Sequence, residues 1–210
     1  MRENLYCFIG ANEMRVLIIY AHPNPNSFNH AILENICFGL QEAGHEVRVK
    51  DLYGEKFNPV LGAKELAVLQ TGKIPEKIKK EQETLFWAEG LIFIYPLWWF
   101  SAPAILKGWF DHALTNGKAF EYTADGGVHG LLKHQRALVL ITAGATEKEL
   151  SRKDAQDIAY PVTTGTLGFC GIQDVFYRIF YRIPTLSHQE RVKILNEVSK
   201  MGKQFSESIF

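Results

Sequence analysis

The chain has 210 residues, 47% of them hydrophobic, and its 23 Lys and Arg residues are matched by 23 Asp and Glu residues. This hydrophobic content excludes a disordered chain, and the balanced charge gives no general attraction to nucleic acid or to anionic membrane surfaces. We therefore expect one compact domain whose partners are small molecules or other proteins.

Residues 1–13 contain an apolar stretch that is too short for a signal-peptide core or a membrane span. Because Met14 directly precedes a strong strand pattern, we expect residues 1–13 to be a loose extension and residues 14–210 to form a single domain. No other run could span a membrane, and the widely spaced cysteines favour free thiols in a reducing compartment, so we expect a cytoplasmic protein. These cysteines are Cys7, Cys37 and Cys170.

The first part of this domain has the pattern of a strand, a helix and a second strand. Val16–Tyr20 is a short β-branched run without polar alternation, as expected of a strand buried on both faces. Apolar residues recur at helical spacing from Ile32 to Ala43, and Gly44 follows as a stop signal. Glu46–Asp51 alternates in polarity and predicts a strand at the edge of a sheet.

The rest of the chain continues the alternation, with proline opening two of the helices. The last helix has Ser187 as its cap and Glu190 at the capping-box position. Alternating strands and helices predict an α/β fold with an open five-stranded parallel sheet and helices on both faces. The expected segments are an extended arm at Phe57–Val60, helices at Ala63–Gln70, Glu76–Ala88, Pro103–Leu114, Pro161–Phe169 and Ser187–Phe210, and strands at Leu91–Tyr95, Ala137–Thr142 and within Gln173–Ile183.

Three loops follow buried strands, at the edge where such sheets bind ligands. The first loop, His22–Asn29, has neither a GxGxxG fingerprint nor a Walker A sequence. It leads into a helix N-terminus, where free N–H groups and the helix dipole favour an anion such as a phosphate. The alternative is that Ser27 only caps the helix and that the two prolines only shape the turn.

The second loop, Pro96–Ala102, carries the adjacent aromatic residues Trp98, Trp99 and Phe100, which cannot all point into one core. An aromatic cluster at this edge suits a planar, partly apolar ligand. A dimer interface or a hydrophobic cap on the core is the alternative. The third loop, Thr142–Thr146, consists of small residues and lets the backbone approach a ligand closely.

Five motifs lie in order along the chain: AHP…SFN in the first loop, FNPV at Phe57–Val60, PLWWFSAPAILKGWFDHAL at Pro96–Leu114, ITAG at Ile141–Gly144 and GFCG at Gly168–Gly171. Together they resemble the NAD(P)H:quinone oxidoreductase family, which includes DT-diaphorase and ancillary subunits of bacterial potassium-efflux systems. The resemblance runs from about Met14 to Ile183. It implies a flavodoxin-like three-layer sandwich, a tightly bound flavin, NAD(P)H as hydride donor, a quinone or similar flat acceptor, and a homodimer.

The resemblance also implies a role for each loop. The first would hold the phosphates, the second would line the isoalloxazine, and the third would face its pyrimidine end. Hydride would reach the flavin N5, and backbone donors near Gly144 and Ala145 would stabilise the resulting charge. Phe120 and Tyr122 would reach the neighbouring subunit's pocket, and Phe169 would line the local one. The cofactor-binding positions are His22, Ser27, Phe28, Asn29, Pro96, Leu97, Trp98, Trp99, Phe100, Thr142, Ala143, Gly144 and Ala145.

The chain departs from the family after Ala145. Animal quinone reductases carry a tyrosine and a histidine there that are thought to relay charge, and Glu147–Asp154 contains neither. We therefore assign no catalytic side chain. FAD is favoured over FMN because the long segment Leu52–Lys73 resembles that of FAD-binding members.

Other sites are disfavoured. There is no GxSxG sequence, and the spacing of His129 and His134 fits no zinc site, so no metal is expected. Glu76–Glu83 has mixed charge and predicts a solvated helix face. Arg178 and Arg182 could grip a phosphate, but surface ion pairs are the favoured interpretation.

Two further functions stay open. One is a regulatory or electron-carrying flavoprotein, for example an ancillary subunit of a membrane transporter. A small one-electron carrier that docks basic partners is expected to be acidic, and this chain is not. The other is a family member that has lost its flavin. The acceptor and the choice between NADH and NADPH are not specified by the sequence.

Overall fold

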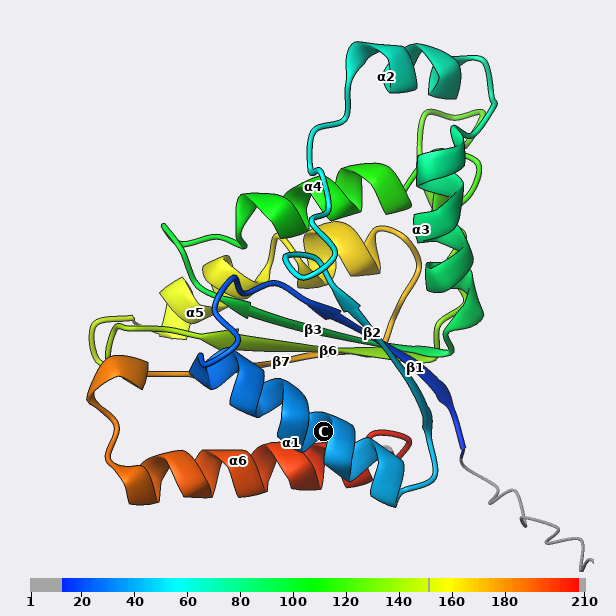
Figure 1. The fold of residues 1–210 in the computed structure, drawn as a ribbon. Helices are drawn as coiled ribbons and strands as arrows, with labels where there is room; N and C mark the ends of the chain where they lie inside the picture. The colour runs from blue at the N-terminus through cyan, green and yellow to red at the C-terminus, as the bar shows by residue number, and fades with distance from the viewer. Residues whose placement is uncertain (1–12, 151, 208–210) are drawn as a thin grey trace, which may run out of the picture.

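The structure is a computed structural model that describes residues 13–150 and 152–207. Its main sheet has five parallel strands in the order β2-β1-β3-β6-β7, which confirms the predicted sheet (Figure 1). The alternating segment β2 lies at an edge, as expected. The predicted extension at residues 1–13 falls outside the described residues except for Glu13. The strands are β1 Arg15–Tyr20, β2 Glu46–Asp51, β3 Gly90–Pro96, β6 Arg136–Thr142 and β7 Val175–Phe180.

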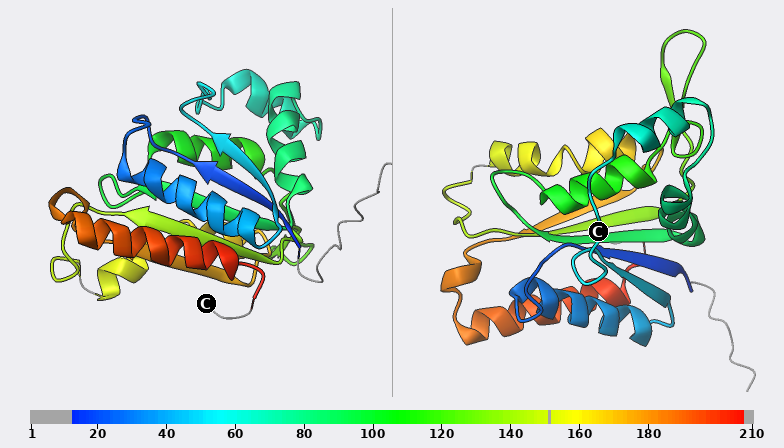
Figure 2. Two further views of the ribbon diagram at one scale, coloured as in Figure 1. Left: turned by 60° about the horizontal axis from the view of Figure 1, so that its bottom comes forward. Right: turned by 45° about the horizontal axis from the view of Figure 1, so that its top comes forward.

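Helices cover both faces of this sheet (Figures 1 and 2). The helices α1 and α6 pack side by side on one face. The helix α2 stands apart above α3 in Figure 1 and has no buried residue. The helices are α1 Phe28–Glu42, α2 Ala63–Gln70, α3 Glu76–Trp87, α4 Ala104–Ala113, α5 Arg152–Ala159, a π-helix at Thr163–Gly168, a short 3-10 helix at Ile183–Thr185, and α6 His188–Lys203.

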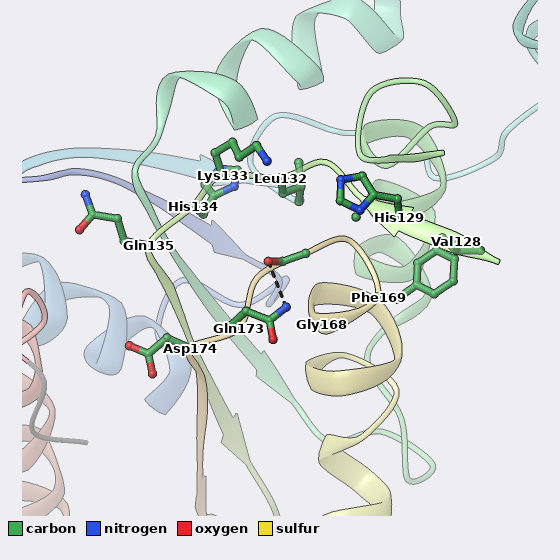
Figure 3. A pocket seen from close by; sticks show the side chains of 12 residues that line it. Val128, His129, Leu132, Lys133, His134, Gln135, Gly168, Phe169, Gln173 and Asp174 are labelled. Atoms are coloured by element: carbon green, nitrogen blue, oxygen red, sulfur yellow. Dashed lines mark hydrogen bonds between the residues drawn. The ribbon is translucent and has the colours of Figure 1, made fainter. Parts of the chain in front are cut away.

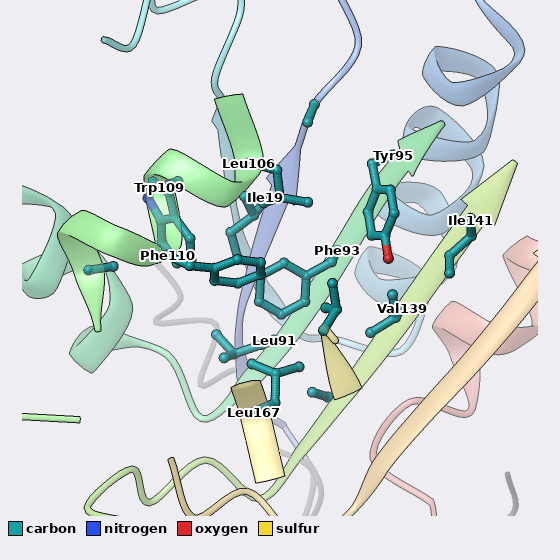
Figure 4. Close-up of a cluster of buried hydrophobic side chains, with 14 of the residues drawn as sticks. Ile19, Leu91, Phe93, Tyr95, Leu106, Trp109, Phe110, Val139, Ile141 and Leu167 are labelled. Carbon is teal, nitrogen blue, oxygen red and sulfur yellow. The ribbon is translucent and has the colours of Figure 1, made fainter. Parts of the chain in front are cut away.

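The core lies on both sides of β3 and β6, whose residues are buried throughout. Alternate side chains of β3 enter two clusters, because successive residues of a strand point to opposite faces. Phe93 packs against Trp109 and Phe110 of α4, with ring centroids 6.2 and 5.4 Å apart (Figure 4). This packing fixes α4, and with it the loop that precedes α4.

The cap of α6 forms as predicted. The backbone N–H of Glu190 donates to Ser187 Oγ, and the backbone N–H of Ser187 donates to Glu190 Oε2 at 2.8 Å. These reciprocal bonds satisfy donors that a helix start otherwise leaves free. The helix ends at Lys203 rather than continuing to Phe210.

Helix α5, a hairpin and the short 3-10 helix were not expected from the sequence. Helix α5 begins at Arg152, several residues after the third loop, and the hairpin of β4 (Phe120–Tyr122) and β5 (Val128–Gly130) precedes β6. The strands of the hairpin are only three residues long and largely exposed, so they lack a clear hydrophobic pattern. The dipeptide Asp125–Gly126, with Gly126 at φ +84°, is the turn signal that could have indicated the hairpin.

The prediction that Glu76–Glu83 is a wholly solvated face is wrong. Glu81 and Gln82 lie on the inward side of α3 and are buried. Glu81 accepts hydrogen bonds from Trp109 Nε1 and Lys50 Nζ, both at 2.9 Å. Gln82 Nε2 donates to Thr115 Oγ1 at 2.8 Å. Buried polar groups are tolerated here because each of these side chains finds partners.

Candidate functional site

The three loops meet at one edge of the sheet. They follow β1, β3 and β6, which are neighbours, and the arrowheads of β3 and β6 in Figure 1 point to this edge. The Leu97 N–H donates to the Thr142 carbonyl at 2.7 Å, which joins the second loop to the third. The Ala21 N–H donates to the Ile94 carbonyl at 3.0 Å, which aligns the first loop beside the second. The predicted convergence of the loops is therefore present.

In the first loop, Ser27 caps α1 by accepting the His30 N–H at 3.2 Å. The Asn24 N–H donates to His22 Nδ1, so the ring proton of neutral His22 lies on Nε2. Burial lowers the pKa of His22 and favours this neutral form. The ring of His22 lies 6.2 Å from that of Trp98, which brings the first and second loops into contact.

Asn29 connects the first loop to the third. Its side chain is buried, with 3% exposure, and its Nδ2 donates to Thr142 Oγ1 at 2.7 Å. Its Oδ1 is buried and accepts no hydrogen bond. An unpaired buried acceptor is costly, so it marks a place where a donor from a bound molecule would be favourable.

The second loop contains a tight turn with an unusual backbone. Trp98 and Ser101 exchange two backbone hydrogen bonds of 3.1 and 3.0 Å around Trp99 and Phe100. These two central residues have φ of 50° and 59°, the left-handed conformation that normally selects Asn or Gly. The turn leaves Trp99 96% exposed and Phe100 64% exposed. Strained residues that display large aromatic rings to solvent indicate a ligand surface.

The third loop is hydrogen-bonded to the segment after β7 on one side, and some of its backbone N–H groups have no partner in the described part of the chain. Thr142 and Ala143 are buried, and the Ala143 N–H donates to the Phe180 carbonyl at 2.8 Å. The N–H groups of Gly144 and Ala145 have no acceptor among the described residues. The same is true of the N–H groups of Trp99 and Phe100, the two central residues of the second-loop turn. The edge therefore presents backbone donors from two loops to an external acceptor.

Phe120, Tyr122 and Phe169 form a separate aromatic cluster. The ring of Phe120 lies 5.2 Å from that of Phe169 and 5.7 Å from that of Tyr122. The cluster borders a cavity of about 260 Å³ that includes Leu114, which follows the end of α4 remote from the second loop. The right-hand view of Figure 2 shows the hairpin projecting from this end. The expectation that Phe169 lines the local pocket while Phe120 reaches the neighbouring one stays a prediction; within one chain the two rings pack together on the same surface.

A further cavity, of about 680 Å³, is not at the three loops (Figure 3). Its lining residues Gln135 and Asp174 directly precede β6 and β7, which places it at the amino-terminal edge of the sheet. His129, Lys133 and Phe169 also line it. Among the described residues, no cluster of His, Cys, Asp or Glu could hold a metal ion.

The two arginines considered as phosphate ligands form surface ion pairs. Arg178 pairs with Glu197 at 2.9 Å and Arg182 with Glu190 at 2.8 Å. Another arginine, Arg191 of α6, lies close to the end of the first loop, with its guanidinium 5.3 Å from the ring centre of Phe28. Sequence analysis missed Arg191, because only the packing of α6 on α1 brings it there.

A smaller cavity of about 270 Å³ lies beside the first loop. Asp51 and Tyr53, from the end of β2, line it together with His22 and His30. No sequence motif marks Asp51 or Tyr53, and their place follows from the pairing of β2 with β1.

Of the described cysteines, Cys37 and Cys170 are both free thiols, and burial raises the pKa of each to about 11. None of the described helices is long and apolar enough to cross a membrane.

Comparison with known proteins identifies the family. Residues 14–201 match the family described as having a flavodoxin-like fold. NAD(P)H dehydrogenase (quinone) 1 of Cavia porcellus is 35% identical, over 86% of this chain and 73% of its own length. An uncharacterized NAD(P)H oxidoreductase of Haemophilus influenzae is 36% identical, over 85% of this chain and 89% of its own length. The solved NAD(P)H:quinone oxidoreductase from Methanothermobacter marburgensis has a TM-score of 0.83 and 32% identity, and covers 94% of this chain and 100% of its own. The chain therefore belongs to the flavodoxin-like family of NAD(P)H:quinone oxidoreductases.

Proposed function

We propose that this protein is a flavin-dependent NAD(P)H oxidoreductase that carries out two-electron reduction of quinones or similar flat acceptors. The observation that carries the proposal is the edge formed by the three loops. It combines a helix N-terminus, exposed aromatic rings and unpaired backbone donors at Gly144 and Ala145. The names of the relatives support the same activity.

The residues of this edge fit a flavin. A phosphate suits the start of α1, where the first N–H groups lack helical partners. Trp99 and Phe100 offer apolar surface to a ring system. The donors at Gly144 and Ala145 suit ring carbonyl and nitrogen acceptors. A methyl group built on Gly144 would come no nearer than 4.0 Å to Pro184, so packing within the chain does not demand this glycine.

When bound, a flavin supplies a group that takes hydride from NAD(P)H and passes two electrons to an acceptor. In this proposal His22, Ser27, Phe28 and Asn29 hold the phosphate end, and Arg191 adds positive charge nearby. The second loop, including Pro96 and Leu97, lines the ring and excludes water. The N–H groups of the third loop stabilise negative charge at the pyrimidine end, since preorganised donors cost no reorganisation during reaction.

The finer assignments stay part of the proposal. FAD is preferred because of the long Leu52–Lys73 segment, with FMN as the alternative, and release of the cofactor followed by mass measurement decides between them. A cytoplasmic location is supported by the free thiols of Cys37 and Cys170. The acceptor is expected to be quinone-like because the exposed rings of the second loop are flat and apolar.

We further propose that the protein acts as a homodimer. The aromatic cluster of Phe120, Tyr122 and Phe169 lies at the opposite end of α4 from the second loop. Tyr122 and Phe169 are exposed, and a second copy would cover them. In the dimer, this cluster would complete the pocket of the neighbouring subunit. Equilibrium sedimentation of the purified protein tests this arrangement.

Anaerobic titration of the purified, flavin-loaded protein with NADPH and NADH tests the activity. Direct bleaching to the two-electron-reduced form, followed by reoxidation with a quinone, is expected. A stable one-electron form that does not react with either nucleotide would instead support an electron carrier. Colourless protein that takes up neither FAD nor FMN would contradict the proposal.

A further inference from the structure

The segment Phe180–Leu186, here called the strap, links β7 to α6 and runs behind the third loop. In Figure 1 its orange 3-10 helix lies beside the loop that follows β6. Three backbone hydrogen bonds join the strap to that loop. The Ala143 N–H donates to Phe180, the Ile183 N–H donates to the Ala143 carbonyl at 3.1 Å, and the Arg182 N–H donates to the Ala145 carbonyl at 2.9 Å.

Arg182 is the strained residue of the strap. Its φ is 56° and its ψ is 29°, a left-handed conformation that a residue with a Cβ rarely adopts. This conformation turns its N–H toward Ala145 while its side chain turns toward α6. There the guanidinium donates to Glu190 Oε1 at 2.8 Å.

The acceptor of that bond is itself fixed. Glu190 is the carboxylate of the capping box, and bonds from Ser187 hold its pKa low, at about 2. It is therefore charged throughout the neutral range. Arg191 holds the same strap by donating to the Ile183 carbonyl at 2.7 Å and the Leu186 carbonyl at 3.2 Å. The N-terminus of α6 thus anchors the strap, and the strap holds the third loop.

We propose that Arg182 is a positioning residue that aims the Gly144 and Ala145 donors through its left-handed backbone and its anchor on Glu190. The inference rests on the proposed flavin site. The Ala143 carbonyl shares a rigid peptide plane with the Gly144 N–H, so the bond from Ile183 of the strap sets the direction of that donor. The bond from the Arg182 N–H to the Ala145 carbonyl holds the other end of the Gly144–Ala145 segment. Releasing the Ala145 carbonyl would therefore free this segment to turn, and its N–H groups would change direction.

The chain offers a matched control for the ion pair. Arg178 and Glu197 also join β7 to α6, at 2.9 Å and with similar exposure, but Arg178 makes no bond to the third loop. If the Arg182–Glu190 pair only joined the strap to α6, as the Arg178–Glu197 pair joins β7 to α6, loss of either arginine would have the same effect on flavin binding. If Arg182 positions the third loop, only the loss of Arg182 will weaken flavin binding.

Three variants of the flavin-loaded protein test the inference. Arg182→Val removes the anchor and disfavours the left-handed backbone, so we expect its flavin dissociation constant to rise about tenfold, the equivalent of one lost hydrogen bond, with a shifted flavin absorbance spectrum and reduction potential. Arg182→Gly loses the anchor but keeps the left-handed backbone without strain, so its dissociation constant should rise by less than that of Arg182→Val and stay within about threefold of the unchanged protein. Arg178→Val should leave affinity, spectrum and potential unchanged. Equal effects of Arg182→Val and Arg178→Val, or no rescue by glycine, would overturn the proposal.

A second readout separates this inference from the proposed function. In flavin-free protein, amide hydrogen exchange reports the bonds from positions 182 and 183 to the third loop. We expect exchange at these amides to become about tenfold faster in Arg182→Val and to stay unchanged in Arg178→Val. If exchange is faster in Arg182→Val but the protein binds no flavin, the role of Arg182 in holding the third loop is supported and the proposed function is contradicted. If exchange is unchanged in Arg182→Val, the role of Arg182 is contradicted whether or not the protein binds flavin.

Discussion

Asn29 and Thr142 lie 113 positions apart in the chain, yet the Asn29 carboxamide donates to the Thr142 hydroxyl at 2.7 Å. The bond joins the start of α1 to the end of β6 inside the protein, behind the open edge. It connects the first loop directly to the third loop, which are the two loops proposed to hold the phosphate end and the pyrimidine end of a flavin. A flavin would therefore meet two preset ends rather than two independent loops.

Asn29→Ala tests this coupling. The substitution leaves the buried Thr142 hydroxyl without its donor, and we expect a loss of about 1–3 kcal/mol in the free energy of unfolding together with weaker flavin binding. Urea denaturation and flavin titration measure the two effects. Asn35→Ala on the same helix is the control, since among the described residues the Asn35 side chain donates only to the Ala31 carbonyl. Equal flavin affinity in both variants would show that the Asn29 bond does not shape the site.

Trp99→Gly should separate stability from function. Glycine adopts the positive φ of this position without strain, and the exposed indole makes few contacts, so we expect the folded state to gain about 0.5–1 kcal/mol. The rate of NAD(P)H oxidation should fall because an aromatic wall is lost. Trp98→Gly relieves no positive φ and should lower the melting temperature. A lower melting temperature for Trp99→Gly would disprove the strain argument.

Glu81→Ala should destabilise the protein without touching the candidate site. It leaves the Trp109 indole without its acceptor and leaves Lys50 with only its more exposed partner, Glu55, at 2.7 Å. Because the pair keeps slight solvent contact, we expect a loss of about 2–3 kcal/mol, below the range for fully buried pairs. Glu83→Ala on the exposed side of α3 breaks only a surface pair with Lys79 and should cost less than about 0.5 kcal/mol. Similar denaturation midpoints for the two variants would contradict this assignment.

His134 should make the protein less stable in acid. Burial lowers the pKa of His134 from the ordinary value of 6.5. Its Nδ1 is also buried without a hydrogen-bond partner, so the N–H formed there by protonation would have no acceptor. The unfolded chain therefore binds the proton more readily, and stability present above pH 6.5 is lost as the pH falls. Urea midpoints between about pH 7 and pH 5 should fall less steeply in His134→Gln than in the unchanged protein. The exposed residue His129 serves as control, and a slope that changes equally in His129→Gln would exclude His134 as the cause.

The sequence alone predicts the sheet well, because Val16–Tyr20, Leu91–Tyr95 and Ala137–Thr142 are apolar without interruption. It also predicts the cap of α6, whose Ser187 and Glu190 interact locally. The convergence of the three loops follows from strand order and needs no knowledge of side-chain packing. These features depend on local pattern or on general rules of parallel sheets.

What the sequence could not predict depends on contacts between distant residues. Phe169 joins Phe120 only because the turn after the π-helix meets the hairpin. Glu81 looks solvated within its charged run, and only the approach of Trp109 and Lys50 makes its burial possible. Arg191 and the left-handed backbone of Arg182 have no signature at all, since neither glycine nor asparagine marks the turn.

The remoteness of the Phe120–Phe169 cluster from the second loop has a genetic consequence in the proposed dimer. Each chain contributes its second loop to one pocket and its Phe120–Phe169 cluster to the other pocket. Substitutions in these two parts of one chain therefore affect different pockets. A chain with a defective second loop, mixed with a chain lacking Phe120, would form hybrid dimers with one wholly intact pocket. Two inactive proteins would thus restore part of the activity when they exchange subunits.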